Sequence, residues 1–420
     1  MDGVEVVTSG REVAVVGAGI VGTCCALYLQ REGFAVTLID RAGPGQACSA
    51  GNAGGFGYAS CIPAALPGIL RALPRMLVDP ASPLILRWRH LPRLLPWFSQ
   101  FVRNANAAKV EDSADARAAL TFQLFDAYAP LLAAAGVEDM VQRRGWLSVF
   151  ESEKGFQAAQ HGLELRQRRG IEIQVLDQTQ VHEMEPALSP RVIRGVLMPQ
   201  AGHTVNPLRL TQALAADFVA KGGRLMRQCV RGFEMTSDGP RALVTDEAPV
   251  RVDQIVIAAG AWSAALARQL GSPIPLAAER GYHVMMPSPR IQLRRPINSP
   301  ERHVAISSME HGLRVSGISE FAPPDAPPRK HAVDRLTDHA KALCPELSSQ
   351  GMTTWMGARP SLPDSRPVIG RSPRHPNVFF AFGHDQIGLG TAAITGKLIG
   401  ELATGRASSI DLSPYHPERF

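Results

Sequence analysis

The chain has 420 residues and a mass of 45.2 kDa, which exceeds one average domain and leaves room for two. Hydrophobic residues make up 45% and charged residues 20%, values that exclude a disordered, collagen-like or coiled-coil chain. The net charge of +6 is a modest surplus that suits anionic ligands or lipid headgroups but is too small to indicate nucleic-acid binding.

The cysteines indicate the redox compartment of the protein, and the apolar segments indicate whether it enters a membrane. The six cysteines form no CxxC pair and no Cys/His metal spacing, so we expect neither a disulfide framework nor a metal site. Residues 13–30 carry no charge and are long enough to suggest a membrane span or signal peptide. Because three glycines interrupt this segment and acidic residues precede it, we expect a cytoplasmic protein without a cleaved leader.

The first forty residues predict one βαβ unit. Residues 13–16 form a β-branched, apolar strand, residues 23–31 have a helical pattern that Gly33 ends, and residues 35–39 form a second buried strand that finishes at Asp40. The turn between the first strand and the helix reads Gly17-Ala18-Gly19-Ile20-Val21-Gly22.

This turn has the dinucleotide-binding pattern G-x-G-x-x-G. The first glycine makes the turn, the second admits a pyrophosphate to the backbone, and the third brings the helix against the strand. Asp40 is positioned to bind ribose hydroxyls, and Arg41 follows it. The alternative is a glycine-rich turn that binds nothing. NAD and FAD share the motif, but a small-residue loop and a long insertion follow Asp40, which favours a flavin.

The middle of the chain interrupts the βα alternation. Residues 43–57 are rich in glycine and other small residues, and residues 62–103 are basic, contain seven prolines and predict short helical pieces. This basic insertion suits either a lid or a peripheral contact with an anionic membrane. A helix at 112–138, a strand at 145–150, a helix at 155–170 and a strand at 195–198 follow.

Later segments complete a discontinuous α/β domain. We expect helices at 206–221 and 391–402, buried strands at 224–230, 254–259 and 378–382, and antiparallel strands at 282–286, 303–307 and 313–318. The fold class is therefore α/β, or α+β overall, with a discontinuous Rossmann-like domain and a mixed antiparallel-sheet domain. The first would comprise 1–60, 200–265 and 350–420, and the second 61–199 and 266–349.

A second candidate constellation lies near the C-terminus. Trp355-Met356-Gly357-Ala358-Arg359-Pro360 precedes the strand 378–382, and Gly383-His384-x-x-x-Gly388-Leu389-Gly390 leads into the last helix. A helix N-terminus aimed at a flavin ring stabilises the negative charge of its reduced form. The alternative is an ordinary strand-to-helix turn.

These motifs, with Ser49-x-x-Asn52-Ala53-Gly54 and the segment 258–263, resemble the D-amino-acid oxidase-type family of FAD-dependent oxidoreductases. Within it they are most similar to bacterial D-amino-acid and D-hydroxyproline dehydrogenases. The resemblance implies a glutathione-reductase-type FAD domain and oxidation of an amine beside a carboxylate. The loop His384-Asp385-Gln386-Ile387 departs from the usual Gly/Thr-rich version, and no cysteine matches a covalent flavin link, so non-covalent FAD is expected.

The resemblance also implies roles for individual residues. Arg359 would bind the substrate carboxylate and so orient Cα for hydride transfer to flavin N5. His384, Tyr282, His303 and Tyr58 are further candidates for the substrate site, although Tyr282 and its neighbour His283 should face opposite sides of a strand. The expected FAD contacts are Gly17, Gly19, Ile20, Val21, Gly22, Asp40, Arg41, Ser49, Asn52, Ala53, Gly54, Val230, Ala259, Gly260, Trp262, Gly383, Gln386, Ile387, Gly388, Leu389, Gly390 and Thr391.

The expected activity is dehydrogenation of a D-amino acid, small or cyclic, such as D-proline or D-hydroxyproline. The alternatives are a glycine- or sarcosine-type oxidase that uses O2, and an electron-relay subunit of a hetero-oligomer; a nicotinamide enzyme is the least favoured. The expected partners are the amino acid and an acceptor such as quinone or a redox subunit. A homo- or hetero-oligomer, and a peripheral position on the inner face of the cytoplasmic membrane, fit the same sequence.

Overall fold

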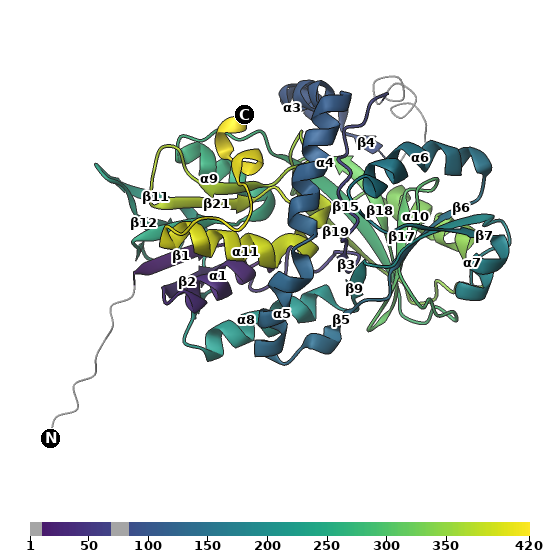
Figure 1. The fold of residues 1–420 in the computed structure, drawn as a ribbon. Coiled ribbons are helices and arrows are strands. Elements are labelled where there is room, and N and C mark those ends of the chain that lie inside the picture. The colour runs from purple at the N-terminus through teal and green to yellow at the C-terminus, as the bar shows by residue number, and fades with distance from the viewer. Residues whose placement is uncertain (1–10, 69–83) are drawn as a thin grey trace.

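The computed structural model describes residues 11–68 and 84–420 (Figure 1). Its first sheet has six strands in the order β10-β2-β1-β14-β21-β20. Neighbouring strands are parallel except β20 and β21. The strands are β1 (Glu12–Val16), β2 (Ala35–Ile39), β10 (Arg224–Met226), β14 (Gln254–Ile257), β20 (Val368–Arg371) and β21 (Val378–Phe382). The N-terminal βαβ prediction is confirmed, with β2 pairing in parallel beside β1.

Both faces of this sheet are buried, which explains its nearly continuous apolar strands. Val13 and Val15 of β1 pack on one side with the helices, whereas Ala14 and Val16 pack on the other side. The first face is covered by α1 (Ile20–Arg31), α5 (Leu124–Ala135), α8 (Pro207–Ala220) and α11 (Gly388–Thr404). The second is covered by α9 (Ser263–Gln269) and the small sheet of β11 (Val230–Thr236), β12 (Gly239–Thr245) and β13 (Val250–Arg251).

A second, nine-stranded sheet runs in the order β19-β15-β18-β17-β16-β6-β8-β7, with β4 joined to β18. Its strands are β4 (Leu84–Leu86), β6 (Trp146–Phe150), β7 (Gln174–Asp177), β8 (Arg194–Met198), β15 (Ala277–Met286), β16 (Ile297–Ser299), β17 (Val304–Met309), β18 (Gly312–Phe321) and β19 (Thr353–Ser361). Helix α10 (Lys330–Leu343) packs on this sheet, and α6 (Glu153–Gln167) and α7 (Gln178–Met184) lie along its β6–β8 end. The predicted antiparallel strands are confirmed.

A three-stranded sheet and two helices complete the described chain. The strands are β3 (Gly55–Phe56), β5 (Val141–Gln142) and β9 (Gly202–Thr204), and the helices are α3 (Leu91–Asn104) and α4 (Ala107–Thr121). The segment Ala107–Ala135, which contains α4 and α5, is long and apolar enough to cross a membrane. Leu120, Leu124 and Tyr128 nevertheless pack in the core beside the six-stranded sheet. Core helices of soluble proteins pass the same test, so this is weak evidence for a span.

Some predicted elements differ from the structure. The strand at 224–230 is wrong as one element, because β10 ends at Met226 and β11 begins at Val230 in another sheet. The helix at 112–138 is two helices, of which the second ends at Gly136 in a left-handed conformation. The insertion at 62–103 contains strand β4 besides helical turns, and Arg71, Arg75 and Asp79 lie outside the described residues. Residues 353–361, which were assigned to the Rossmann-like domain without a predicted strand, form β19 and pair with β15 of the nine-stranded sheet.

Candidate functional site

Two adjoining cavities meet where the carboxyl ends of the parallel strands face the nine-stranded sheet. The first has a volume of about 630 Å³ and extends from the N-terminus of α1 to the N-terminus of α11. The second has a volume of about 610 Å³ and lies against β15, β17 and β18. Five residues line both cavities, namely Cys48, Asn52, Trp355, Gly357 and Asp385. The two cavities therefore share a wall.

The turn at Gly17 leaves space that only glycine permits. Its φ of 106° is left-handed, and a Cβ there would lie 2.5 Å from the Ala258 carbonyl oxygen. A Cβ on Gly22 would lie 1.8 Å from the Gly17 carbonyl oxygen, so this glycine brings α1 against β1. Helix α1 starts at Ile20, three residues before its predicted start, with Gly19 as its N-cap. The N-terminus of α1 borders this cavity and can face a phosphate, although the Ile20 N–H already donates to Ser49 Oγ.

Asp40 lies at the end of β2 and organises the backbone around the first cavity. Its Oδ2 accepts a hydrogen bond from the Ala18 N–H at 2.8 Å, and its Oδ1 accepts from Ala42 and Gly43 at 2.8 and 3.1 Å. Nearby, the Arg41 guanidinium lies 4.0 Å from the centre of the Trp262 ring. A carboxylate with this position at the second strand suits the ribose of a dinucleotide.

The small-residue loop after Asp40 is held in a fixed shape beside both cavities. Ser49 Oγ accepts a hydrogen bond from the Ile20 N–H at 3.0 Å, and Asn52 Oδ1 accepts from Gly54 at 2.8 Å. Arg314 of β18 donates to the Ala50 carbonyl at 3.0 Å. Gly54 has a φ of 84°, and a Cβ there would lie 2.3 Å from the Thr204 carbonyl oxygen. The loop is therefore fixed against α1, β18 and β9.

Most residues predicted for the cofactor gather around the first cavity. It is lined by Gly17, Gly19, Ile20, Val21, Asp40, Arg41, Ser49, Asn52, Val230, Ala259, Gly260, Trp262, Gly388 and Leu389. Ala53, Gln386, Ile387, Gly390 and Thr391 line the second cavity instead. Gly22, Gly54 and Gly383 line neither cavity and shape the backbone around them.

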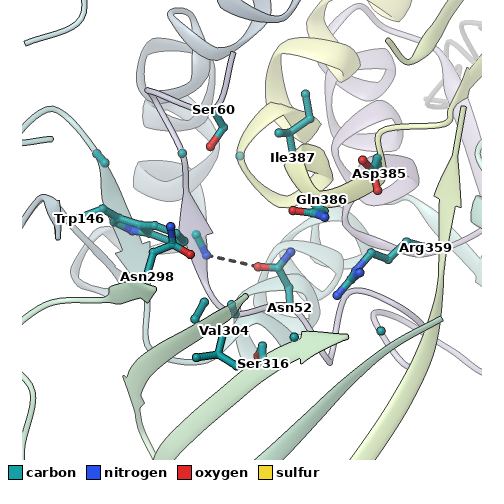
Figure 2. Close-up of a pocket in the computed structure, with 18 of the residues that line it drawn as sticks. Asn52, Ser60, Trp146, Asn298, Val304, Ser316, Arg359, Asp385, Gln386 and Ile387 are labelled. Carbon is teal, nitrogen blue, oxygen red and sulfur yellow. Dashed lines mark hydrogen bonds between the residues drawn. The ribbon is translucent and has the colours of Figure 1, made fainter. Parts of the chain in front are cut away.

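Arg359 lies on β19 with its guanidinium in the second cavity (Figure 2). Its Nη1 donates to Glu279 Oε1 at 2.9 Å across the β15–β19 pair, and Glu279 also accepts from the Ser319 hydroxyl at 2.6 Å. Burial alone would lower the pKa of Arg359, but Glu279 and Asp385 outweigh it and raise that pKa. Arg359 therefore stays cationic and can bind a carboxylate through its remaining N–H groups.

Asp385 lies at the start of the turn that leads into α11 and reaches both cavities. Its φ of 49° is left-handed, and its Oδ1 is buried without a hydrogen-bond partner among the described residues. Burial and the neighbouring Glu279 raise the pKa of this carboxyl to about 7, against the opposing effect of Arg117 and Arg359. Figure 2 shows Asp385, Gln386 and Arg359 along one side of the cavity.

The other residues predicted for the substrate site differ in whether they line a cavity. Tyr282 and exposed His303 line the second cavity, but the Tyr282 hydroxyl donates to Glu320, which does not line it. His384 is buried beside the first cavity, and Nε2 lies 2.9 Å from Thr395 Oγ1; burial lowers its pKa to about 3. Tyr58 stacks on Phe122 and lines neither cavity.

The structure adds residues that the sequence analysis did not assign to the site. His283 lines neither cavity but supports residues that do: it stacks on Trp355 with ring centres 5.0 Å apart, and its Nδ1 lies 3.1 Å from the carbonyl oxygen of Gly51. Glu279 lies before the predicted strand 282–286, so the sequence analysis held no signal for it, and the departure from the family loop was the only signal for Asp385. Further unassigned lining residues are Cys48, Arg117, Trp146, Arg166, Met198, Asn298 and Ser316.

Comparison with known proteins gives one family. A family model described as "FAD dependent oxidoreductase" matches residues 12–402. A D-amino-acid oxidase of Bradyrhizobium diazoefficiens is 36% identical over 418 residues, covering 98% of this chain and 99% of that protein. A D-amino acid dehydrogenase of Rhizobium rhizogenes is 28% identical, covering 97% of this chain and all of that protein.

Solved structures agree in fold. Glycine oxidase from Geobacillus kaustophilus superposes with a TM-score of 0.75 at 21% identity, covering 98% of this chain and 99% of that chain. L-proline dehydrogenase from P. horikoshii superposes with a TM-score of 0.74 at 18% identity, covering 98% of both chains. These likenesses establish the architecture rather than the substrate.

Proposed function

Since the chain belongs to the family of FAD-dependent oxidoreductases, we propose that it oxidises D-amino acids, binding the substrate carboxylate at Arg359. The observation that carries the proposal is a partly exposed arginine in a cavity that shares a wall with the dinucleotide cavity. The similarity to a D-amino-acid oxidase and to D-amino acid dehydrogenases supports the substrate class.

The protein is an FAD enzyme, and the first cavity fits the cofactor. A Cβ at position 17 would fill the space that the glycine turn leaves for a phosphate. The first turn of α1 borders this space, and Asp40 lines the same cavity, where it would bind the ribose. The N-terminus of α11, at Gly388 and Leu389, borders the same cavity. When bound, FAD supplies a two-electron acceptor for the hydride of the substrate Cα.

The residues of the second cavity would bind and orient the amino acid. Two N–H groups of Arg359 fit the two oxygens of a carboxylate, while Glu279 holds the guanidinium in place. The indoles of Trp355 and Trp146 and the side chain of Met198 offer apolar surface to a substrate side chain or ring. Orientation of this kind raises the rate by fixing which Cα hydrogen faces the acceptor.

Three finer features are part of the proposal. The preferred substrates are small or cyclic D-amino acids such as D-proline or D-hydroxyproline, for which apolar walls beside Arg359 leave room. The electron acceptor is a quinone or a partner redox subunit, and FAD is bound non-covalently. The enzyme is placed in the cytoplasm, peripherally on the membrane if quinone is the acceptor.

The test is an absorbance spectrum of the purified protein followed by anaerobic addition of D- and L-proline, hydroxyproline and alanine. Bleaching of the flavin bands by a D-amino acid, with no bleaching by its L-form, is the expected result. A yellow protein that no amino acid reduces would refute the proposal and favour an electron-relay subunit.

The second candidate function is an oxidase that passes its electrons to O2. The 36% identity to a D-amino-acid oxidase favours it specifically. Admitting air to the reduced enzyme separates the two, because an oxidase would recover its flavin bands and produce hydrogen peroxide at the rate of turnover. A dehydrogenase would recover them only with another acceptor.

A further inference from the structure

We propose that Asp385 accepts the proton of the substrate ammonium group, a role that rests on the proposed amino-acid oxidation. An amino acid at neutral pH is an ammonium carboxylate, whereas hydride leaves Cα readily only when the nitrogen lone pair is free. A base beside the carboxylate-binding arginine therefore meets a chemical need of this substrate class.

The position of Asp385 meets the geometric requirement. It lines both cavities, so its carboxyl lies at the wall where a substrate in the second cavity meets a cofactor in the first. Its Oδ1 is buried and accepts no hydrogen bond within the described parts of the chain. An unpaired buried carboxyl oxygen is costly, and an incoming ammonium group would satisfy it.

The charges around Asp385 suit a proton acceptor. Glu279 of β15 disfavours its ionised form, whereas Arg359 of β19 and Arg117 of α4 favour that form. Cys48 of the small-residue loop also lies within its electrostatic reach, but burial raises the pKa of that thiol to about 11, so it is neutral. Burial and these charges bring the pKa of the Asp385 carboxyl to about 7, so at neutral pH it can both take and release a proton.

The other titratable groups of the site are less suited. His384 is buried against the Thr395 hydroxyl, and the Tyr282 hydroxyl is bonded to Glu320 outside the cavity. Glu279 already accepts from Arg359 and Ser319. The left-handed backbone of Asp385, which aspartate tolerates better than most residues, is the kind of local strain that persists at functional sites.

The proton-transfer step balances without a further reactant. One N–H bond of the ammonium breaks and one O–H bond forms on Asp385, which leaves a neutral amine and a neutral carboxylic acid. The electron pair freed on nitrogen then stabilises the iminium product as hydride leaves Cα. Asp385 returns its proton to solvent when the product leaves. The two-electron acceptor is the FAD already required by the family.

The pH dependence of kcat/KM for a reducing D-amino acid tests this role in Asp385→Asn holoenzyme. The wild-type value should rise to about pH 7 and then level off. In the variant it should fall about 10²–10⁴-fold at pH 7 and keep rising until the free amine of the substrate deprotonates. Asp112→Asn, a change at an exposed residue of α4, should match the wild type.

A binding measurement separates proton transfer from a structural role. 2-Aminoisobutyrate has an ammonium group and no Cα hydrogen, so it binds without being oxidised. Calorimetry in two buffers of different ionisation enthalpy should show release of about half a proton per site near pH 7 in the wild type, because Asp385 must ionise to meet the ammonium. Asp385→Asn should release none.

Three outcomes would overturn the proposal: a uniform loss of kcat/KM at every pH, a pH profile unchanged by the substitution, or equal proton release by both proteins. If 2-aminoisobutyrate binds too weakly for calorimetry, the pH profile alone decides. Failure of the proposed function is distinguishable, because then no D-amino acid would reduce the flavin in the wild type either.

Discussion

Replacing Arg359 with methionine removes the expected carboxylate contact while keeping a side chain of similar length. The guanidinium is 18% exposed and donates to Glu279 at 2.9 Å. The substrate would lose charge-assisted hydrogen bonds worth about 1.5–3 kcal/mol, and the uncompensated Glu279 would repel its carboxylate. Together these two effects should reduce transition-state stabilisation by about 3–4 kcal/mol, which is a decrease in kcat/KM of roughly 150- to 1,000-fold.

The assay is anaerobic flavin reduction by a D-amino acid at increasing concentration, with the FAD content measured first from the visible spectrum. Arg359→Lys keeps the charge but loses the planar pair of donors, so we expect an intermediate loss of about tenfold. Arg251→Met on exposed β13 is the matched control and should leave kcat/KM unchanged. A yellow Arg359→Met enzyme with the wild-type KM would refute the carboxylate role.

Further predictions address the cofactor, the buried hydroxyl and pH. Gly17→Ala should abolish FAD retention, seen as loss of the 450 nm band from a protein that remains folded by circular dichroism, because the new Cβ would lie 2.5 Å from a carbonyl oxygen. Tyr282→Phe should lower the free energy of unfolding by about 1–3 kcal/mol in a denaturant titration but change kcat less than threefold, since the hydroxyl bonds to buried Glu320; a large loss of kcat would contradict this. Burial lowers the pKa of both His283 and His384 to about 3, so the unfolded state binds more protons between pH 6.5 and 3, and stability should fall with acidification by up to about 1.4 kcal/mol per pH unit for each. Urea titrations at pH 7 and 5 measure this, and a stability independent of pH in that range would count against neutral buried imidazoles.

The parts of the fold that sequence predicts are those in which local pattern decides the structure. The turn at Gly17 and the strand before it follow from steric limits and apolar alternation within a few residues. The break between β10 and β11 was missed because both flanking segments have strand-like composition, and only pairing with different sheets separates them. Local pattern carries no information on such partners.

The residues of the candidate site were likewise predictable only where local sequence determines their position. The glycine turn at 17–22 is contiguous in sequence, so its residues were found together. Glu279 and Arg359 are separated by 80 positions and meet only because β15 pairs with β19. The pairing that joins them could not be read from either strand alone, although the resemblance to a family identified Arg359. The failure of Tyr58 to reach a cavity has the same origin, because its orientation depends on packing against Phe122 of another segment.

The two cavities share part of their lining, so any change in that shared wall alters both. Cys48, Asn52, Trp355, Gly357 and Asp385 line both cavities, so each of these residues is available to a ligand on either side. Where an amino acid raises the equilibrium affinity for the flavin through these residues, thermodynamic reciprocity requires the flavin to raise the affinity for the amino acid by the same factor.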